Sequence, residues 1–191
     1  APVVQWTTVR LMLILENLLG LKSKQADVTA AFLHATLEED EKVYVEMPLG
    51  FKQRGSNGKF KVLRLKKTLY GLRQSPRAFW KYLTEKLGNC GLPQAPFDPC
   101  LFIGKKVIAI CYVDDLIFWA RNEKDIVELD VQLHAERVDL EQEDDAAGFL
   151  GVKMTKTEGG LLEMKQTGLI DRILDALGLV VGPADVKRQA V

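Results

Sequence analysis

Two adjacent aspartates, Asp114 and Asp115, lie between two apolar runs at residues 107–111 and 116–120. Each run has the length and the β-branched or aromatic content of a buried strand, so we expect the pair at the turn of a hairpin. Adjacent carboxylates beside apolar strands repel each other and lose hydration, which favours protonation of one of them. A divalent cation would bind both as anions and could hold a phosphate there. The alternative is a solvent-exposed turn, because Asp is common in turns.

The composition is that of an ordinary globular protein. The 191 residues, 47% of them hydrophobic and 27% charged, are enough for one large domain or two small ones. No apolar stretch approaches transmembrane length, and the start of the chain shows no secretory signal pattern. We therefore expect an intracellular, cytoplasmic protein that is neither membrane-bound nor secreted. The chain opens at Ala1 without Met, as expected of a fragment or a processed piece.

The cysteines give no pattern of a metal or disulfide site. Cys90, Cys100 and Cys111 are odd in number, and no two of them stand two residues apart. This argues against a zinc site or a disulfide framework and is typical of a reducing compartment. His34 and His134 are isolated, so a Cys–His nucleophile pair has no specific support.

Charge is unevenly distributed although the formal net charge is zero. Residues 52–86 contain eleven basic residues and one acid, interleaved with aromatic residues, whereas residues 123–145 contain ten acids and two basic residues. The basic block is the pattern expected of a surface that binds a nucleic-acid backbone. A solvated face with aromatic core residues behind it is the alternative. The acidic segment is more typical of an exposed helix face than of a site.

The hydrophobic pattern predicts an α+β domain, in which short antiparallel strands have helices packed on one side. The helix at residues 8–19 is apolar almost all round and should be deeply buried, with Thr7 or Thr8 as its cap. Ser75 should cap a second helix that ends at Gly88, and Asn122 a third. The remaining expected elements are a helix over 169–177, a second hairpin from 149–156 and 161–165, strands over 43–47, 60–65 and 100–103, and a weak extended pattern at 25–28.

Several sequence blocks along the chain, taken together, resemble those of one protein family. They are residues 9–12 followed by 25–34, then 43–51, 65–79, 98–102, 112–115 and 149–152. In this order they resemble the reverse transcriptases of copia-type LTR retrotransposons. The similarity covers nearly the whole chain, and so many blocks in sequence are specific where residues 112–115 alone would not be. Residues 33–35 depart from the family pattern, which usually has Gly where this chain has Ala35.

The resemblance implies a right-hand polymerase palm with partial fingers, an antiparallel sheet backed by helices, over residues 1–191. The upstream fingers strands, the thumb and RNase H are expected outside this range. Asp27 and Asp114 would hold two Mg²⁺ ions, for which Mn²⁺ could substitute, and Asp115 would complete the site. Two such ions can activate a primer 3′-hydroxyl and stabilise the leaving pyrophosphate in an in-line displacement.

The resemblance also implies roles for residues around the aspartates. Phe32 matches an aromatic position that crowds the sugar 2′ carbon and would favour deoxynucleotides; alternatively it is a core residue. Tyr70, Gly71 and Tyr112 would lie near the incoming nucleotide, although retroviral enzymes carry Gln where this chain has Tyr70. The residues expected to contact template and primer are Lys66, Lys67, Arg73, Gln74, Ser75 and Pro76.

The function implied is RNA-directed DNA synthesis within a retrotransposon Pol polyprotein. The expected partners are an RNA template, a DNA primer, deoxynucleoside triphosphates and the RNase H and integrase parts of the polyprotein, with virus-like particles as a candidate location. One alternative is a catalytically decayed remnant that binds nucleic acid through the basic block, with steep salt dependence and indifference to Mg²⁺. Another is a structural, capsid-associated fragment of the polyprotein.

Overall fold

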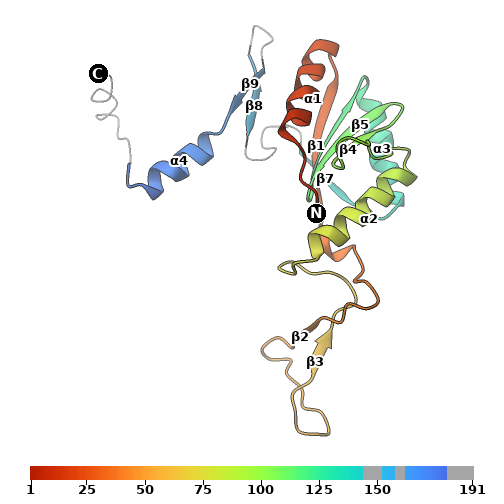
Figure 1. Cartoon of the computed structure of the whole chain (residues 1–191), viewed down its shortest axis with the longest axis vertical. Helices are drawn as coiled ribbons and strands as arrows, with labels where there is room; N and C mark the ends of the chain where they lie inside the picture. Colours follow the sequence, from red (N-terminus) through yellow and green to blue (C-terminus); the bar gives the residue numbers. More distant parts are fainter. Residues whose placement is uncertain (144–151, 158–161, 180–191) are drawn as a thin grey trace.

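The computed structural model describes residues 1–143, 152–157 and 162–179. Its centre is a five-stranded antiparallel sheet in the order β4-β5-β6-β1-β7, with helices on both faces (Figure 1). This mixed helix and antiparallel sheet architecture confirms the α+β class. In chain order the elements are α1 (Trp6–Leu19), β1 (Lys22–Val28), the short 3-10 helix η1 (Ala31–Leu33), β2 (Tyr44–Glu46), β3 (Val62–Arg64), α2 (Ser75–Asn89), β4 (Leu101–Ile103), β5 (Val107–Tyr112), β6 (Asp115–Ala120), α3 (Glu123–Ala135), β7 (Leu140–Glu143), β8 (Lys153–Lys156), β9 (Leu162–Lys165) and α4 (Thr167–Ala176).

Strand β1 lies inside the sheet between β6 and β7. Its antiparallel register runs from Lys22 opposite Ala120 to Asp27 opposite Asp115. The weak extended pattern at residues 25–28 becomes a full strand because both of its edges find backbone partners far away in the sequence. Strand formation here is therefore decided by long-range pairing.

Two apolar cores lie on opposite faces of the sheet. On one face, α2 contributes Phe79, Leu83 and Leu87, the residues that the spacing predicts, and α3 contributes Ile126, Leu129 and Leu133. On the other face, α1 packs Val9, Met12 and Leu13 against Ile110, Ile117 and Trp119. Because helices cover both faces, the expectation of helices on one side only is wrong.

The helix α1 differs from its prediction. It was expected to be deeply buried, but Leu11, Ile14, Leu18 and Leu19 are exposed. The reason is that α1 contacts the sheet through one face, and its opposite face meets little protein. It begins after Gln5, and neither Thr7 nor Thr8 caps it with a side-chain hydrogen bond.

The other helix ends follow the sequence signals approximately. Ser75 is the first residue of α2, not its cap, and Gln74 takes the N-cap position; α2 ends one residue beyond Gly88. Asn122 is the N-cap residue of α3, as predicted, but its side chain bonds the Asp125 carboxylate (3.4 Å) and not a backbone amide. Helix α4 runs over Thr167–Ala176, starting and ending earlier than expected.

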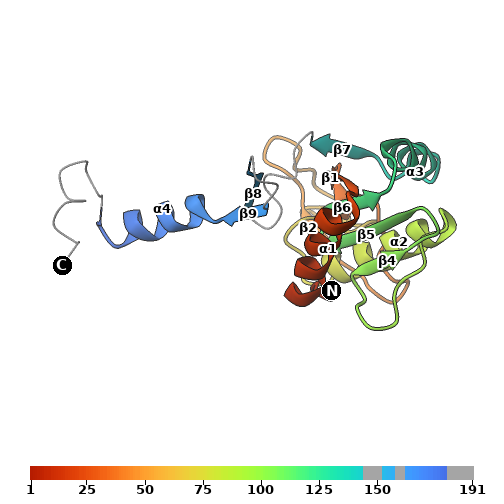
Figure 2. The same cartoon turned by 90° about the horizontal axis from the view of Figure 1, so that it is seen from above.

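Two hairpins extend from the central sheet. The β2–β3 hairpin projects from one end (Figure 1), and the β8–β9 hairpin and α4 lie to one side of the sheet (Figure 2). The predicted turn at 158–160 and most of the block at 149–152 lie outside the described residues. Of the acidic segment, residues 123–135 form the expected helix, but Leu140–Glu143 is strand β7. None of the described helices is long and apolar enough to cross a membrane.

Candidate functional site

Asp27 and Asp115 are cross-strand neighbours. The antiparallel register of β1 and β6 places them directly opposite each other, so their side chains leave the same face of the sheet, with Cβ atoms about 4.5–5.5 Å apart in such pairs. Ala26 and Leu116, one position along, point into the core beneath α2 and α3. The two aspartates therefore face the α1 side, and both are half-buried.

Asp114 lies beside this pair on the turn between β5 and β6. Tyr112 pairs with Asp115, which leaves Val113 and Asp114 as the two turn residues. The backbone amide of Val28 donates a hydrogen bond to the Asp114 carbonyl (3.1 Å), so the turn is held against the end of β1. Val113 has φ +59°, a conformation that is costly for a β-branched residue. The expected hairpin is confirmed, with Asp114 in its turn and Asp115 as the first residue of β6.

The donor chemistry of these three residues fits a hard divalent cation. Carboxylate oxygens are the ligands that Mg²⁺ and Mn²⁺ prefer, and Asp27 and Asp115 offer them from one face of the sheet. Within the described residues, no group of three or more His, Cys, Asp or Glu side chains is close enough together to hold a metal ion. A shared site would therefore require the Asp114 side chain to join the other two.

Phe32 and Tyr70 come together although they are far apart in sequence. Their ring centroids are 4.7 Å apart, and Phe32 also meets Phe79 edge-on at 6.0 Å. Phe32 lies on η1, which begins three residues after the end of β1, and is half-buried, whereas Tyr70 is exposed. Phe32 thus packs partly against the core and partly against the exposed Tyr70. This geometry is compatible both with a core residue and with a residue beside the sugar of a nucleotide.

Tyr112 and Gly71 complete the predicted nucleotide-binding set. Tyr112 is half-buried and packs on the α1 side of the sheet, the side that Asp27 and Asp115 face. Gly71 has φ +88°, and a Cβ built on it would meet no atom within 4 Å. Glycine at this position is required by the backbone conformation and not by lack of space.

The residues predicted to contact template and primer divide into three groups by their exposure to solvent. Lys66, Lys67 and Arg73 are exposed, and their charges are available at the surface. Ser75 is fully buried, and its hydroxyl donates a hydrogen bond to the Leu69 carbonyl (2.6 Å). Its side chain fixes the loop before α2 and does not face outward. The half-buried residues of the set are Gln74 and Pro76.

Two buried polar residues, Thr68 and Asp98, tie loops to neighbouring elements, and neither was assigned a role from the sequence. The Thr68 hydroxyl donates a hydrogen bond to the Phe32 carbonyl, and the Thr68 amide donates one to the Ala35 carbonyl (2.9 Å). These two bonds tie the loop that carries Tyr70 to η1. Asp98 accepts hydrogen bonds from the Thr8 hydroxyl (2.6 Å) and the Cys100 amide (2.9 Å). Both lie within blocks that carry the family resemblance, Thr68 in 65–79 and Asp98 in 98–102, but neither block indicates these hydrogen bonds.

The cysteines and histidines make structural contacts around this arrangement. The Cys111 thiol donates a hydrogen bond to the Val113 carbonyl (3.5 Å), within the turn that carries Asp114. All three cysteines are free thiols, and burial raises the pKa of each, that of Cys100 to about 11. His34 Nε2 lies 2.8 Å from the Thr29 carbonyl, and His134 Nδ1 lies 2.6 Å from the Asp139 carboxylate. Thiols with raised pKa values are poor nucleophiles at neutral pH, which disfavours cysteine chemistry.

Comparison with known proteins gives one consistent picture. The family model described as "Reverse transcriptase (RNA-dependent DNA polymerase)" matches residues 1–184. The Retrovirus-related Pol polyprotein from transposon TNT 1-94 of Nicotiana tabacum is 31% identical over 185 residues, covering 94% of this chain and 14% of that protein. The Pol polyprotein from transposon RE1 of Arabidopsis thaliana is 29% identical over 175 residues, covering 90% of the chain and 12% of that protein.

A yeast relative extends the same set. The Transposon Ty1-GR3 Gag-Pol polyprotein of Saccharomyces cerevisiae is 26% identical over 166 residues, which is 83% of the chain and 9% of that protein. The chain therefore spans at most 14% of the length of these three relatives.

Proposed function

Because the chain belongs to the reverse transcriptase (RNA-dependent DNA polymerase) family, we propose that it forms the palm and part of the fingers of an RNA-directed DNA polymerase within a retrotransposon Pol polyprotein. The observation that carries this proposal is the placement of the aspartates. Asp27 lies opposite Asp115, and the Asp114 carbonyl is bonded to the amide of Val28, next to Asp27. Asp27 and Asp115, far apart in sequence, thus form a carboxylate pair on one sheet face, with Asp114 on the turn beside them.

The proposed role of Asp27, Asp114 and Asp115 is to bind two divalent cations. When bound, such ions supply the positive charge that activates a primer 3′-hydroxyl and stabilises a leaving pyrophosphate. Asp27 and Asp115 project from paired strands and so are fixed relative to each other. Asp114 projects from the strained turn, whose backbone is anchored to β1.

The Phe32–Tyr70 pair is proposed to form one wall of the nucleotide site. Phe32 is held from behind by Phe79 and by the hydrogen bond that its carbonyl accepts from Thr68. A ring fixed in this way would exclude a ribose 2′-hydroxyl sterically and so favour deoxynucleotides. Gly71 and Tyr112 are proposed to line the same site, from the loop beside Tyr70 and from the strand beside Asp115.

The proposed partners follow from this activity. Lys66, Lys67 and Arg73 would contact the RNA template and the DNA primer through their phosphates, while Gln74, Ser75 and Pro76 would shape the start of α2 beside them. We propose that residues 1–191 act within a longer Pol polypeptide that carries RNase H and integrase, in the cytoplasm and in virus-like particles.

The test is primer extension on an RNA template with deoxynucleotides and Mg²⁺, using a longer Pol polypeptide that contains this chain. The parent should extend the primer, and Asp114→Asn should not, since it removes the carboxylate charge while keeping the shape of the side chain. Asp171→Asn, an exposed position on α4, is the matched control and should retain activity. Circular dichroism of all three proteins checks that the fold is kept.

Each result has a distinct meaning. Extension by Asp114→Asn would contradict the assignment of this residue. Failure of the parent together with intact binding of an RNA–DNA hybrid, insensitive to Mg²⁺, would instead support the catalytically decayed remnant.

A further inference from the structure

The β2–β3 hairpin ends in an ordered tip made of residues 47–61. Beyond β2 and β3, the ladder continues through an Arg54–Phe60 bridge, and the Lys61 amide bonds the Gln53 carbonyl (2.8 Å). The Gly55 amide donates to the Lys59 carbonyl (2.8 Å), and Gly58, at φ +73°, closes the turn by donating to Gly55 (3.0 Å). The tip therefore has a defined backbone on which its side chains can be placed.

An aromatic ring and two cations meet on this tip. The Arg54 guanidinium carbon lies 4.5 Å from the centroid of the Phe60 ring, and the Lys52 ammonium nitrogen lies 5.8 Å from it. Phe60 remains 55% exposed, and Phe51, on the facing segment, is 70% exposed. Exposed apolar side chains that lie together are typical of surfaces that bind a partner.

The charge of the tip has one sign. Residues 47–61 contain four basic side chains and no acid, and all four are exposed. They are Lys52, Arg54, Lys59 and Lys61. An acid outside the tip, Glu46, lies 3.5 Å from Lys52 and offsets part of the charge. The ligand that complements this surface is therefore an anion that also has an aromatic or apolar face.

We propose that the hairpin tip binds an unpaired nucleic-acid strand, with a base stacked on Phe60 beside Arg54 and the strand's phosphates contacted by Lys59 and Lys61. Unpaired bases expose their faces to aromatic side chains, whereas bases within a duplex do not, so an exposed ring among cations selects single strands. A purely basic surface would bind duplex and single strand through phosphates alike.

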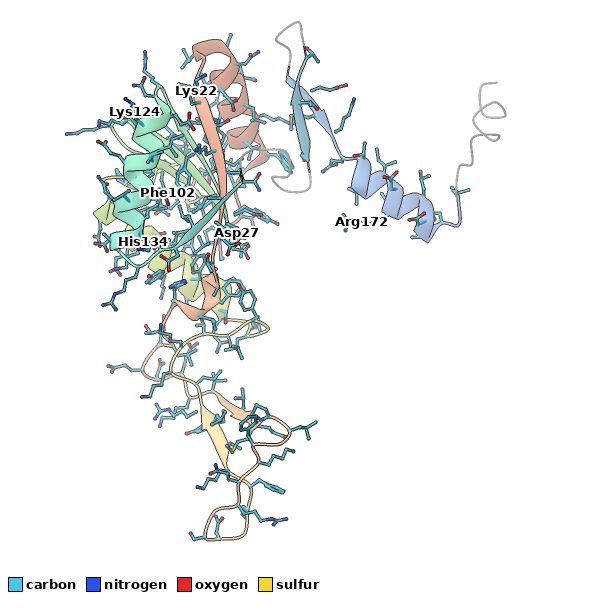
Figure 3. The ribbon with its side chains drawn as sticks, turned by 180° about the vertical axis from the view of Figure 1, so that it is seen from behind. Lys22, Asp27, Phe102, Lys124, His134 and Arg172 are labelled. Carbon is cyan, nitrogen blue, oxygen red and sulfur yellow. The ribbon has the colours of Figure 1, made fainter. Side chains whose placement is uncertain are left out.

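The position of the tip indicates which strand it would take. The hairpin extends from the end of the sheet at which Asp27 lies, away from the Lys22 end (Figure 3). If the proposed polymerase function holds, the ligand is the template strand outside the paired region. This assignment of the strand rests on the proposed function, whereas binding of an unpaired strand by the tip does not.

Fluorescence anisotropy with the 191-residue chain tests the proposal, using a short labelled single-stranded RNA and the same RNA annealed to complementary DNA. EDTA in the buffer removes any contribution of metal. Phe60→Leu should weaken single-strand binding about tenfold and leave duplex binding within about twofold, because only the stacking surface is lost. Phe60→Trp should retain the affinity of the parent.

The matched control is Phe97→Leu, which changes another exposed phenylalanine (64%) outside the hairpin and should leave both affinities unchanged. The double variant Lys59→Gln with Lys61→Gln should weaken binding of single strand and duplex together and reduce the salt slope by about 1–2. Circular dichroism again verifies folding, which these exposed positions should not affect.

Three outcomes would overturn the proposal. The first is a single-strand affinity of Phe60→Leu within about twofold of the parent. The second is an equal loss of single-strand and duplex binding in that variant. The third is that Phe60→Leu loses affinity for labelled polyglutamate as strongly as for single-stranded RNA. That result would make the tip a docking site for acidic protein segments. Asp114→Asn should bind the single-stranded RNA as the parent does, so failure of this proposal and failure of the proposed catalysis give different results.

Discussion

The backbone amide of Val28 donates a hydrogen bond to the carbonyl oxygen of Asp114 across 3.1 Å. This bond links the end of β1 to the turn between β5 and β6, and so it connects the residue after Asp27 to the other two aspartates. Val113, inside the same turn, has φ +59°. The turn is therefore held in a strained shape by its neighbours, as is common where a backbone presents functional groups.

Replacing Val113 by glycine should lower the rate of nucleotide addition while changing the free energy of unfolding little. The variant loses the strain of a β-branched residue at positive φ but gains unfolded-state entropy, so its free energy of unfolding should change by no more than about 1 kcal/mol. Nucleotide addition should fall, because a flexible turn fixes Asp114 and Asp115 less well. Urea unfolding and primer extension measure the two effects.

Asparagine at the same position is the control, since it tolerates positive φ while remaining less flexible than glycine. Val113→Asn should keep more activity than Val113→Gly. Equal activity of both variants and the parent would show that the rigidity of this turn does not matter.

Phe32→Val should relax discrimination against ribonucleotides. Removing the ring opens the space where a 2′-hydroxyl would lie, so extension with ribonucleotides should rise relative to extension with deoxynucleotides. The loss of contact with Tyr70 and Phe79 should also cost about 1–3 kcal/mol of stability. Single-nucleotide incorporation assays with each sugar give the ratio.

Tyr70→Phe is the companion variant, because it keeps the ring that packs on Phe32 and removes only the hydroxyl. Its sugar discrimination should equal that of the parent. A Phe32→Val enzyme with unchanged discrimination would support the alternative in which Phe32 is only a core residue.

The parts of the fold that the sequence predicted are those decided locally. The spacing of Phe79, Leu83 and Leu87 marks the buried face of α2, and the two apolar runs around Asp114 form their hairpin. Such patterns depend on neighbouring residues alone. The full length of β1 depended instead on pairing with β6 and β7, which no local pattern encodes.

The same distinction applies to the site. Asp114 and Asp115 could be proposed from their own surroundings, because apolar strands flank them. Asp27 could be proposed only through the family resemblance, since its segment carries a weak strand pattern. The roles of Thr68 and Asp98 in holding loops together were not predictable, because each bonds residues that are distant in sequence.

Trp119→Phe should be strongly destabilising. The indole nitrogen donates a hydrogen bond to the Glu16 carboxylate (2.9 Å) in the buried contact between α1 and the sheet. Without that donor a buried carboxylate loses a hydrogen bond, so the free energy of unfolding should fall by about 2–4 kcal/mol. Urea unfolding followed by circular dichroism measures the loss.

Trp80→Phe provides the comparison, because the Trp80 indole donates to a backbone carbonyl, that of Pro99 (3.2 Å), from a half-buried position. Its cost should be about 1 kcal/mol. Combining Trp119→Phe with Glu16→Met should cost less than the sum of the two single changes, since the carboxylate that loses its donor is then also removed. Strict additivity would contradict the importance of this hydrogen bond.

The thiol of Cys100 should make stability depend on pH in the alkaline range. Burial, with a smaller contribution from the charge of Asp98, raises its pKa from an ordinary value of 9.0 to about 11. The unfolded chain therefore loses this proton at lower pH than the folded chain, so the stabilisation is complete below about pH 9 and is lost as the pH rises towards 11. Between about pH 8 and about pH 10 the loss from this group should be about 1 kcal/mol. Urea unfolding at both pH values should show a smaller decrease for Cys100→Ala than for the parent, and an equal decrease would mean that the folded chain does not suppress ionisation of this thiol.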